Sequence, residues 1–167
     1  MLNKIETDPE LSKIIVCECC ENGVCVTIDK KIDRNDYIIL KPDNYYNTKN
    51  FAVPPPSADC IIIRKCKDNG WGLTIAELKN IQTSSNFELE NLTEKFKTCL
   101  NDFIQNRFKI LNIEYKDIKL YFVSNIEIYK RDIGPKVDML INTRFKYREK
   151  QYMITPYMPN PMIKNCY

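Results

Sequence analysis

Residues 59–79 read DCIIIRKCKDNGWGLTIAELK, and this stretch decides the fold. Two apolar runs, each rich in isoleucine or leucine, lie on either side of the sequence Asp68-Asn69-Gly70. Aliphatic runs of this length, joined by Asn and Gly, are typical of two strands and the turn between them. We therefore predict a β-hairpin over residues 59–79.

The hairpin converts sequence spacing into geometry, because antiparallel partners have a constant sum of residue numbers. If the loop is centred on Asn69, Asp59 faces Lys79; if it is centred one residue earlier, Asp59 faces Glu77. A three-residue loop with Gly70 in the left-handed conformation favours the first register. In either register the two acids and the lysine share one face of the sheet.

Opposed residues on one face lie about 4.5–5.5 Å apart at Cβ, so two carboxylates there can share one divalent cation. The alternative is that Asp59, Glu77 and Lys79 are ordinary polar strand ends, since Glu-x-Lys often occurs by chance. The combination of an acid before one buried strand, Glu-x-Lys at the end of its partner and a helix next in sequence favours a functional site.

The segments Pro56-Ser57-Ala58-Asp59 and Glu77-Leu78-Lys79 resemble the signature of the PD-(D/E)xK nuclease superfamily. In this chain the proline lies three residues before the aspartate instead of next to it. The resemblance covers about residues 54–125. It implies an α/β (α+β) fold of the restriction-endonuclease-like type, a mixed central β-sheet flanked by helices, here with an N-terminal β-hairpin and extra C-terminal strands.

The resemblance also implies an activity, metal-dependent hydrolysis of phosphodiester bonds. Asp59 and Glu77 would bind Mg²⁺ or Mn²⁺ together with the backbone carbonyl of Leu78, and Lys79 would orient or deprotonate the attacking water. DNA is the expected substrate and RNA the alternative. Small nucleases of this type often form homodimers that cut both strands, so a homodimer is an option here.

Composition removes several competing chemistries. The chain contains no histidine, which excludes Ser-His-Asp and Cys-His catalysis and histidine-ligated zinc. Its 167 residues, 44% of them apolar and 28% charged, suit a single domain over residues 1–167. The sequence shows neither a membrane span nor a signal peptide, so we expect a cytoplasmic protein with no membrane partner.

Eight cysteines in such a chain argue against a disulfide framework and raise the question of zinc. Cys17, Cys19, Cys20 and Cys25 lie within one short hairpin, whose turn is Asn22-Gly23, and there Cys20 would face Cys25. The other two would point to the opposite side, so the four thiols cannot converge on one metal. We interpret these cysteines as buried thiols.

The flanking segments complete a β-β-α-β order. Residues 13–20 and 24–31 are expected to form the N-terminal hairpin, residues 37–41 a third strand, and residues 42–57 an irregular segment. A long helix is predicted over residues 86–111, with Ser85 and Glu88 as its capping box, and a strand over residues 118–124. The apolar stripe of the helix consists of Leu89, Leu92, Phe96, Cys99, Leu100 and Phe103.

Two sets of residues are weaker candidates. A third acidic ligand could come from Glu10, Glu18, Glu21 or Asp36, each of which is otherwise a solvated acid. Residues 144–150 read RFKYREK; as one strand they would present Arg144, Lys146, Arg148 and Lys150 on one face, where they could follow phosphates. Basic residues that protect an edge strand from aggregation are the alternative. Gln82, just beyond the Glu-x-Lys motif, could also contact nucleic acid.

Two functions of other classes remain. One is a non-catalytic nucleic-acid-binding or assembly module with the same fold. The other is a zinc-stabilised interaction domain built on the cysteine hairpin.

Overall fold

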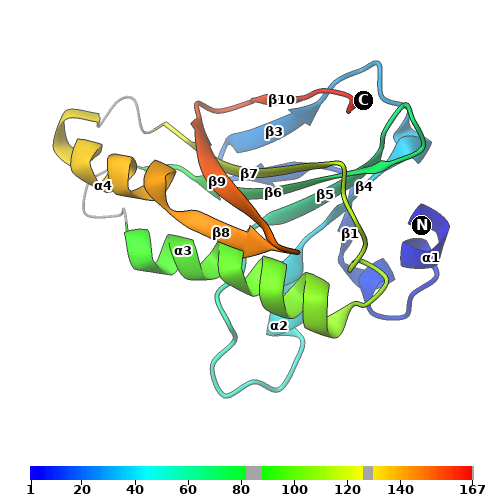
Figure 1. The fold of residues 1–167 in the computed structure, drawn as a ribbon. Helices are drawn as coiled ribbons and strands as arrows, with labels where there is room; N and C mark the ends of the chain where they lie inside the picture. The colour runs from blue at the N-terminus through cyan, green and yellow to red at the C-terminus, as the bar shows by residue number, and fades with distance from the viewer. Residues whose placement is uncertain (82–87, 126–129, 167) are drawn as a thin grey trace.

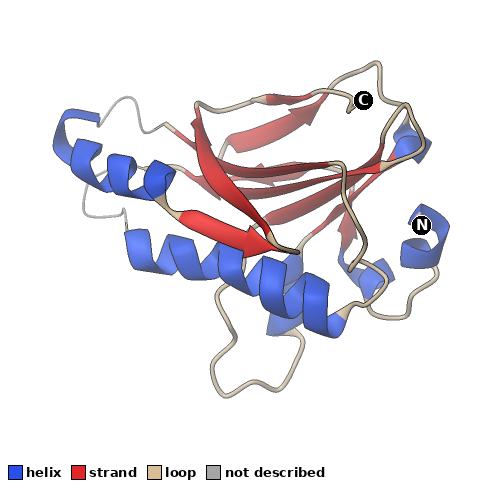
Figure 2. Cartoon of the chain, in the orientation of Figure 1, coloured by secondary structure: helices blue, strands red, loops and turns tan. Residues whose placement is uncertain are grey.

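The computed structural model describes residues 1–81, 88–125 and 130–166, which form a mixed α/β structure (Figures 1 and 2). Its helices are α1 (Leu2–Glu6), α2 (Pro42–Asn47), α3 (Leu89–Lys97) and α4 (Lys130–Asn142). Its strands are β1 (Ile15–Val16), β2 (Cys19–Glu21), β3 (Val24–Ile28), β4 (Tyr37–Leu40), β5 (Cys60–Lys65), β6 (Trp71–Lys79), β7 (Asp117–Ser124), β8 (Arg144–Tyr147), β9 (Lys150–Tyr157) and β10 (Met162–Ile163).

The central sheet has seven strands in the order β1-β4-β5-β6-β7-β9-β8. Strands β4, β5 and β6 form an antiparallel meander, whereas β7 is parallel to β6 and β9 is parallel to β7. A parallel neighbour requires a crossover connection, and α3 lies within the connection from β6 to β7. The predicted β-β-α-β order and the extra C-terminal strands are confirmed.

A second sheet, β10-β3-β2, lies on the face of the central sheet opposite α3 (Figure 1). The alternation of side chains along β5 and β6 produces two cores. Ile61, Ile63 and Ile75 pack beneath the helices, whereas Ile62 and Ala76 pack against the second sheet. Because both faces are covered, the strands read as continuous apolar runs.

The β5–β6 hairpin is confirmed, but its favoured register was wrong. Cys60 pairs with Ala76, so the pairing is centred on Asp68 and Asp59 comes opposite Glu77. The left-handed residue of the turn is Asn69, with φ 63°, and not Gly70. The Cys66 N–H donates to the Gly70 carbonyl at 2.8 Å, which closes a turn symmetrical about Asp68.

Helix α3 presents the predicted apolar stripe to the core, although the helix is not uniform. From Thr98 to Arg107 it continues in wider π-type turns. The capping residue Ser85 lies outside the described residues, and within them the helix begins after Glu88. Phe96 and Phe103 are fully buried, so the long segment after Lys79 is fixed by core packing, as its periodicity indicates.

The N-terminal third differs from the prediction in detail. The hairpin at Asn22-Gly23 is present, with both residues at positive φ and Cys20 opposite Cys25. Its strands are shorter than expected, because Ile15–Val16 pairs with β4 instead of with the second strand of the hairpin. Residues 42–47 form α2, where an irregular segment was predicted; Pro42 at the first helical turn needs no intrahelical partner for its nitrogen.

The argument against disulfides was wrong. The fold joins Cys19 to Cys60, Cys20 to Cys25 and Cys66 to Cys166. Two of these pairs are 41 and 100 residues apart in the chain, so only the tertiary structure brings them together. Cys17 and Cys99 remain free thiols, the first exposed and the second buried.

Candidate functional site

Two buried acids meet at one end of the β5–β6 hairpin. Asp59 directly precedes β5 and Glu77 lies near the end of β6, and their side chains are only 7% and 3% exposed. The Leu78 N–H donates to Asp59 Oδ2 at 2.6 Å, which fixes the aspartate against the neighbouring strand. The hairpin thus brings together the two carboxyl groups that the sequence paired.

A lysine that the sequence analysis missed completes the pair. Lys95, in the second turn of α3, places its Nζ 2.5 Å from Glu77 Oε1. A polar residue one position before Phe96 in an amphipathic helix carries no distinctive signal. Its role becomes visible only when α3 packs over the end of β6.

The acids perturb each other's ionisation. Burial and, as the second cause, the neighbouring Glu77 carboxylate together raise the pKa of Asp59 to about 8. Burial also raises the pKa of Glu77, although Lys95 opposes this effect. Burial lowers the pKa of Lys95, but contact with Glu77 outweighs it, so that the pKa lies above its usual value. The pair therefore holds a proton readily at neutral pH unless a further cation is present.

Lys79 lies two residues beyond Glu77 and half-buried on the same face of β6. Its charge helps to lower the pKa of Glu77. Within the described ranges Lys79 forms no ion pair. The direct contact to Glu77 comes from Lys95 instead. The three predicted catalytic side chains are thus neighbours, and the role of the Leu78 carbonyl stays a prediction.

Two buried polar atoms at this end of the sheet have no hydrogen-bond partner among the described residues. They are Glu77 Oε2 and the hydroxyl oxygen of Ser124. Ser124 ends β7 and pairs in register with Lys79, so it lies beside the acid pair at the same edge. Unpaired buried oxygens are costly and are typical of a site that binds a further group.

Of the four candidates for a third acid, Glu21 lies nearest to the pair. Its charge raises the pKa of both Asp59 and Lys95. The β2–β3 turn carries it there, since the Asn80 side-chain amide donates to the Asn22 carbonyl at 3.1 Å. Glu21 itself forms an ion pair with Lys41 at 3.7 Å.

The remaining acid candidates lie elsewhere. Glu10 forms an ion pair with Lys49, Glu18 is exposed, and Asp36 ends a short helical turn before β4. Across the part of the chain that is described, no group of three or more Cys, Asp or Glu side chains is arranged to hold a metal ion. The donor set at the hairpin is therefore two carboxylates. Two carboxylates are enough for Mg²⁺, which usually keeps several of its waters in protein sites.

The basic segment 144–150 is a hairpin and not the single strand that was expected. Arg148 and Glu149 both have positive φ, at 47° and 66°, and form the two-residue turn between β8 and β9. Arg144 and Lys146 stay on the exposed side of β8, but Arg148 lies in the turn and Lys150 begins β9. The four cations therefore do not share one strand face.

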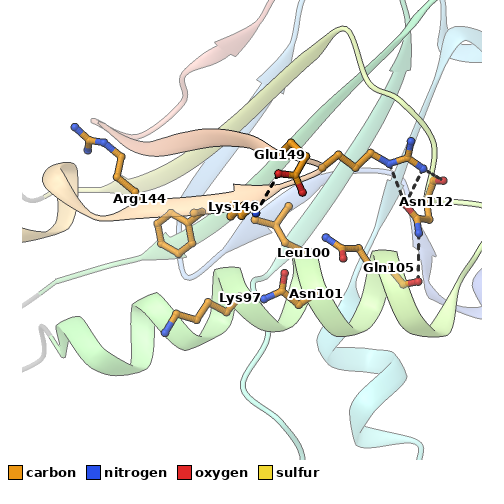
Figure 3. A pocket seen from close by; sticks show the side chains of 10 residues that line it. Lys97, Leu100, Asn101, Gln105, Asn112, Arg144, Lys146 and Glu149 are labelled. Carbon is orange, nitrogen blue, oxygen red and sulfur yellow. Dashed lines mark hydrogen bonds and ion pairs between the residues drawn. The ribbon is translucent and has the colours of Figure 1, made fainter.

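The turn of this hairpin is held by contacts with residues 112 and 114. The Arg148 guanidinium donates to the Asn112 carbonyl and side chain, and Lys150 lies 3.8 Å from Glu114. Between β8 and the helix below it lies a recess of about 640 Å³, shown in Figure 3. Gln82, the remaining nucleic-acid candidate, lies outside the described residues.

No family model, curated protein or solved structure matches this chain. In the described part of the chain, no helix is both long and apolar enough to cross a membrane.

Proposed function

We propose that this protein is a metal-dependent nuclease that hydrolyses phosphodiester bonds, most directly those of DNA. The observation that carries the proposal is the Asp59–Glu77 pair. Two buried carboxyls face each other across neighbouring strands, close enough for a hydrogen bond between them when one is protonated. This is the arrangement that the Asp and Glu-x-Lys pattern predicts for a shared divalent cation.

The topology supports the same proposal. An antiparallel meander followed by a helix and a parallel strand, with the acids at the strand ends beneath the helix, fits the expected restriction-endonuclease-like core. The resemblance to the PD-(D/E)xK superfamily rests on this order and on the residues Asp59, Glu77 and Lys79. The second sheet and the disulfides are additions that the resemblance does not imply.

The chemistry of the donor set fits Mg²⁺ or Mn²⁺. Asp59 and Glu77 would hold the cation, which supplies a more acidic water and neutralises charge that develops on the phosphate. Burial and the Glu77 carboxylate raise the pKa of Asp59, so a bound cation would favour the charged form of this carboxyl. Each residue then has a role that its own chemistry supports.

Lys95 and Lys79 would have different roles at this site. Lys95 holds Glu77 in place in the free protein and would remain beside the pair as a positive charge facing the phosphate. Lys79, with no ion pair among the described residues, is the better placed of the two to orient a water. Substitution of each in turn distinguishes a positioning contact from a direct one.

A non-catalytic module is the second candidate, and one contact favours it. The 2.5 Å ion pair from Lys95 to Glu77 is also what a purely structural buried acid would form. A module of this kind would bind nucleic acid or a partner protein without turnover.

A cleavage assay separates the two functions. Labelled DNA and RNA of several shapes are incubated with the protein in Mg²⁺, Mn²⁺ or EDTA. We expect cleavage only with a divalent ion, and its loss in Asp59→Asn, Glu77→Gln and Lys79→Met, whereas Asp138→Asn, an exposed acid on α4, keeps wild-type activity. Metal-independent cleavage, or full activity of Asp59→Asn, would overturn the proposal.

A further inference from the structure

A polar groove runs between the helical layer and the edge of the central sheet. One wall is the end of α3 with the π-type turns that follow it, and the other is β8 with its turn (Figure 3). Its volume is about 640 Å³. Its polar lining includes Lys97, Asn101, Gln105, Asn112, Arg144 and Lys146.

The lining is strongly biased toward positive charge. Lys97, Arg144, Lys146 and Arg148 contribute four cations, against the single acid Glu149. Lys97 and Lys146 form ion pairs with Glu94 and Glu149, but these pairs are exposed and therefore weak. A polyanion can displace such partners, and amide side chains between the cations offer both donors and acceptors.

The groove is fixed next to the acid pair by a core contact. The rings of Phe96 in α3 and Phe145 in β8 pack with centroids 5.8 Å apart. On either side of Phe96, Lys95 reaches the acid pair and Lys97 lines the groove. One helical turn thus connects the two places.

The sheet registers give the separation along the molecule. Arg144 of β8 pairs with Met153 of β9. When this register is followed across β9 and β7, the residue of β6 at the same height in the sheet is Thr74. Glu77 lies three residues further along and three strands across. With strands about 4.8 Å apart and about 3.3 Å of rise per residue, this is roughly 17 Å.

We propose that this groove binds the sugar-phosphate backbone of single-stranded DNA and leads the strand toward the acid pair. The size of the groove favours a single strand, because about 640 Å³ lies in the range of small-molecule sites. Phe145 is only 3% exposed, so it offers little surface for base stacking. Binding is therefore independent of sequence and dominated by phosphate contacts.

This inference rests on the proposed function for the direction of the strand, but its test does not need cleavage. Binding of fluorescently labelled oligonucleotides is measured by anisotropy in EDTA. The groove variant is Lys97→Ala/Arg144→Ala/Lys146→Ala, and the matched control is Lys4→Ala/Lys30→Ala/Lys31→Ala, which removes the same charge from exposed positions elsewhere. Thermal melts confirm that both variants fold.

We expect the groove variant to bind single-stranded DNA at least about tenfold more weakly, and its salt dependence to fall by about two in log–log slope. The control should change by less than about twofold. Strands of about twelve nucleotides should bind better than strands of about four, because a longer strand places more phosphates near the cations. A second variant, Asn101→Glu, should weaken binding because it adds a negative charge to the groove. Its control, Asn47→Glu on α2, adds the same charge outside the groove and should leave binding unchanged.

Four outcomes would overturn the inference. They are equal losses in the groove and control variants, unchanged binding in the groove variant, equally tight binding of duplex DNA through the same residues, and a preference for single-stranded RNA. If the groove variant loses binding as expected but Asp59→Asn still cleaves DNA, the proposed function is wrong and the groove proposal is kept. If Asp59→Asn abolishes cleavage but the groove variant binds DNA as the wild type does, only the groove proposal is wrong.

Discussion

The two ends of the β5–β6 hairpin both contain buried charge, but only one end is balanced. At the turn end, Arg64 is fully buried and bonds to Asp117 and to the Thr74 hydroxyl. At the open end, two buried acids share one direct lysine contact, from Lys95. Among the described residues, each end has a buried atom without a hydrogen-bond partner, Arg64 Nε in one case and Glu77 Oε2 in the other.

The difference in charge balance indicates a structural role for the turn end and a ligand-binding role for the open end. One cation opposite one acid is a complete pair, and Asp117 also lies 3.3 Å from Lys119. At the open end Lys95 contacts only Glu77 directly and Lys79 acts without a direct ion pair among the described residues, so burial still makes the charged form of Asp59 unfavourable and raises its pKa. A fold keeps such an arrangement most readily where a ligand supplies the missing positive charge.

The largest expected effect comes from substituting an acid at the open end. Asp59→Asn keeps the shape of the side chain but removes a metal ligand, so cleavage should fall by at least about a thousandfold, equivalent to ~4 kcal/mol in the barrier. Single-turnover assays under excess enzyme measure this loss. The matched change at the balanced end, Asp117→Asn, should leave the rate per folded molecule unchanged; an equal loss there would contradict the comparison.

Removal of the cation at the balanced end should affect stability instead. Arg64→Met leaves Asp117 without its buried partner, and breaking a buried pair costs about 3–5 kcal/mol. We expect the low end of that range, because Asp117 keeps Lys119 and some solvent contact. Urea unfolding measures the change. Lys95→Met should cost less, since Glu77 can take up a proton; a larger loss for Lys95→Met would show that the open end is the structural one.

The ionisation of the acid pair also predicts an effect of pH on stability. A carboxyl whose pKa rises from 3.8 unfolded to about 8 folded binds its proton more tightly in the native state. Its contribution to stability is therefore complete below pH 3.8 and is lost as the pH rises toward 8. Unfolding free energies measured from pH 4 to 8 should show this decline in the wild type. The same curve should be flatter in Asp59→Asn, and identical curves would contradict the assigned cause.

Local signals in the sequence were enough to predict much of the fold. The turns at Asn22-Gly23 and at residues 68–70, the stripe of α3 and strand β7 depend on neighbours a few residues apart. Features set by tertiary structure were missed. They include the register of β5 with β6, where Asn69 and not Gly70 takes the left-handed conformation, and the pairing of Cys66 with Cys166.

The candidate site divides in the same way. Asp59 and Glu77 could be placed on one face of the sheet from hairpin spacing, because both possible registers put them there, although the favoured register set Asp59 opposite Lys79. Lys95 and Ser124 could not, since each reaches the acids only when a separate element packs or pairs beside β6. The basic segment failed for another reason: nothing in RFKYREK signals the turn at Arg148-Glu149, two residues that seldom adopt positive φ.

Direct measurement of divalent-ion binding tests the central claim, that the unbalanced acids form a cation site. Calorimetry with Mn²⁺ or Mg²⁺ at pH 8 should show one site in the wild type, with protons released on binding. Asp59→Asn/Glu77→Gln should show no binding, whereas Asp117→Asn should bind as the wild type does. An absence of binding in the wild type, or binding that survives the loss of both acids, would contradict the account.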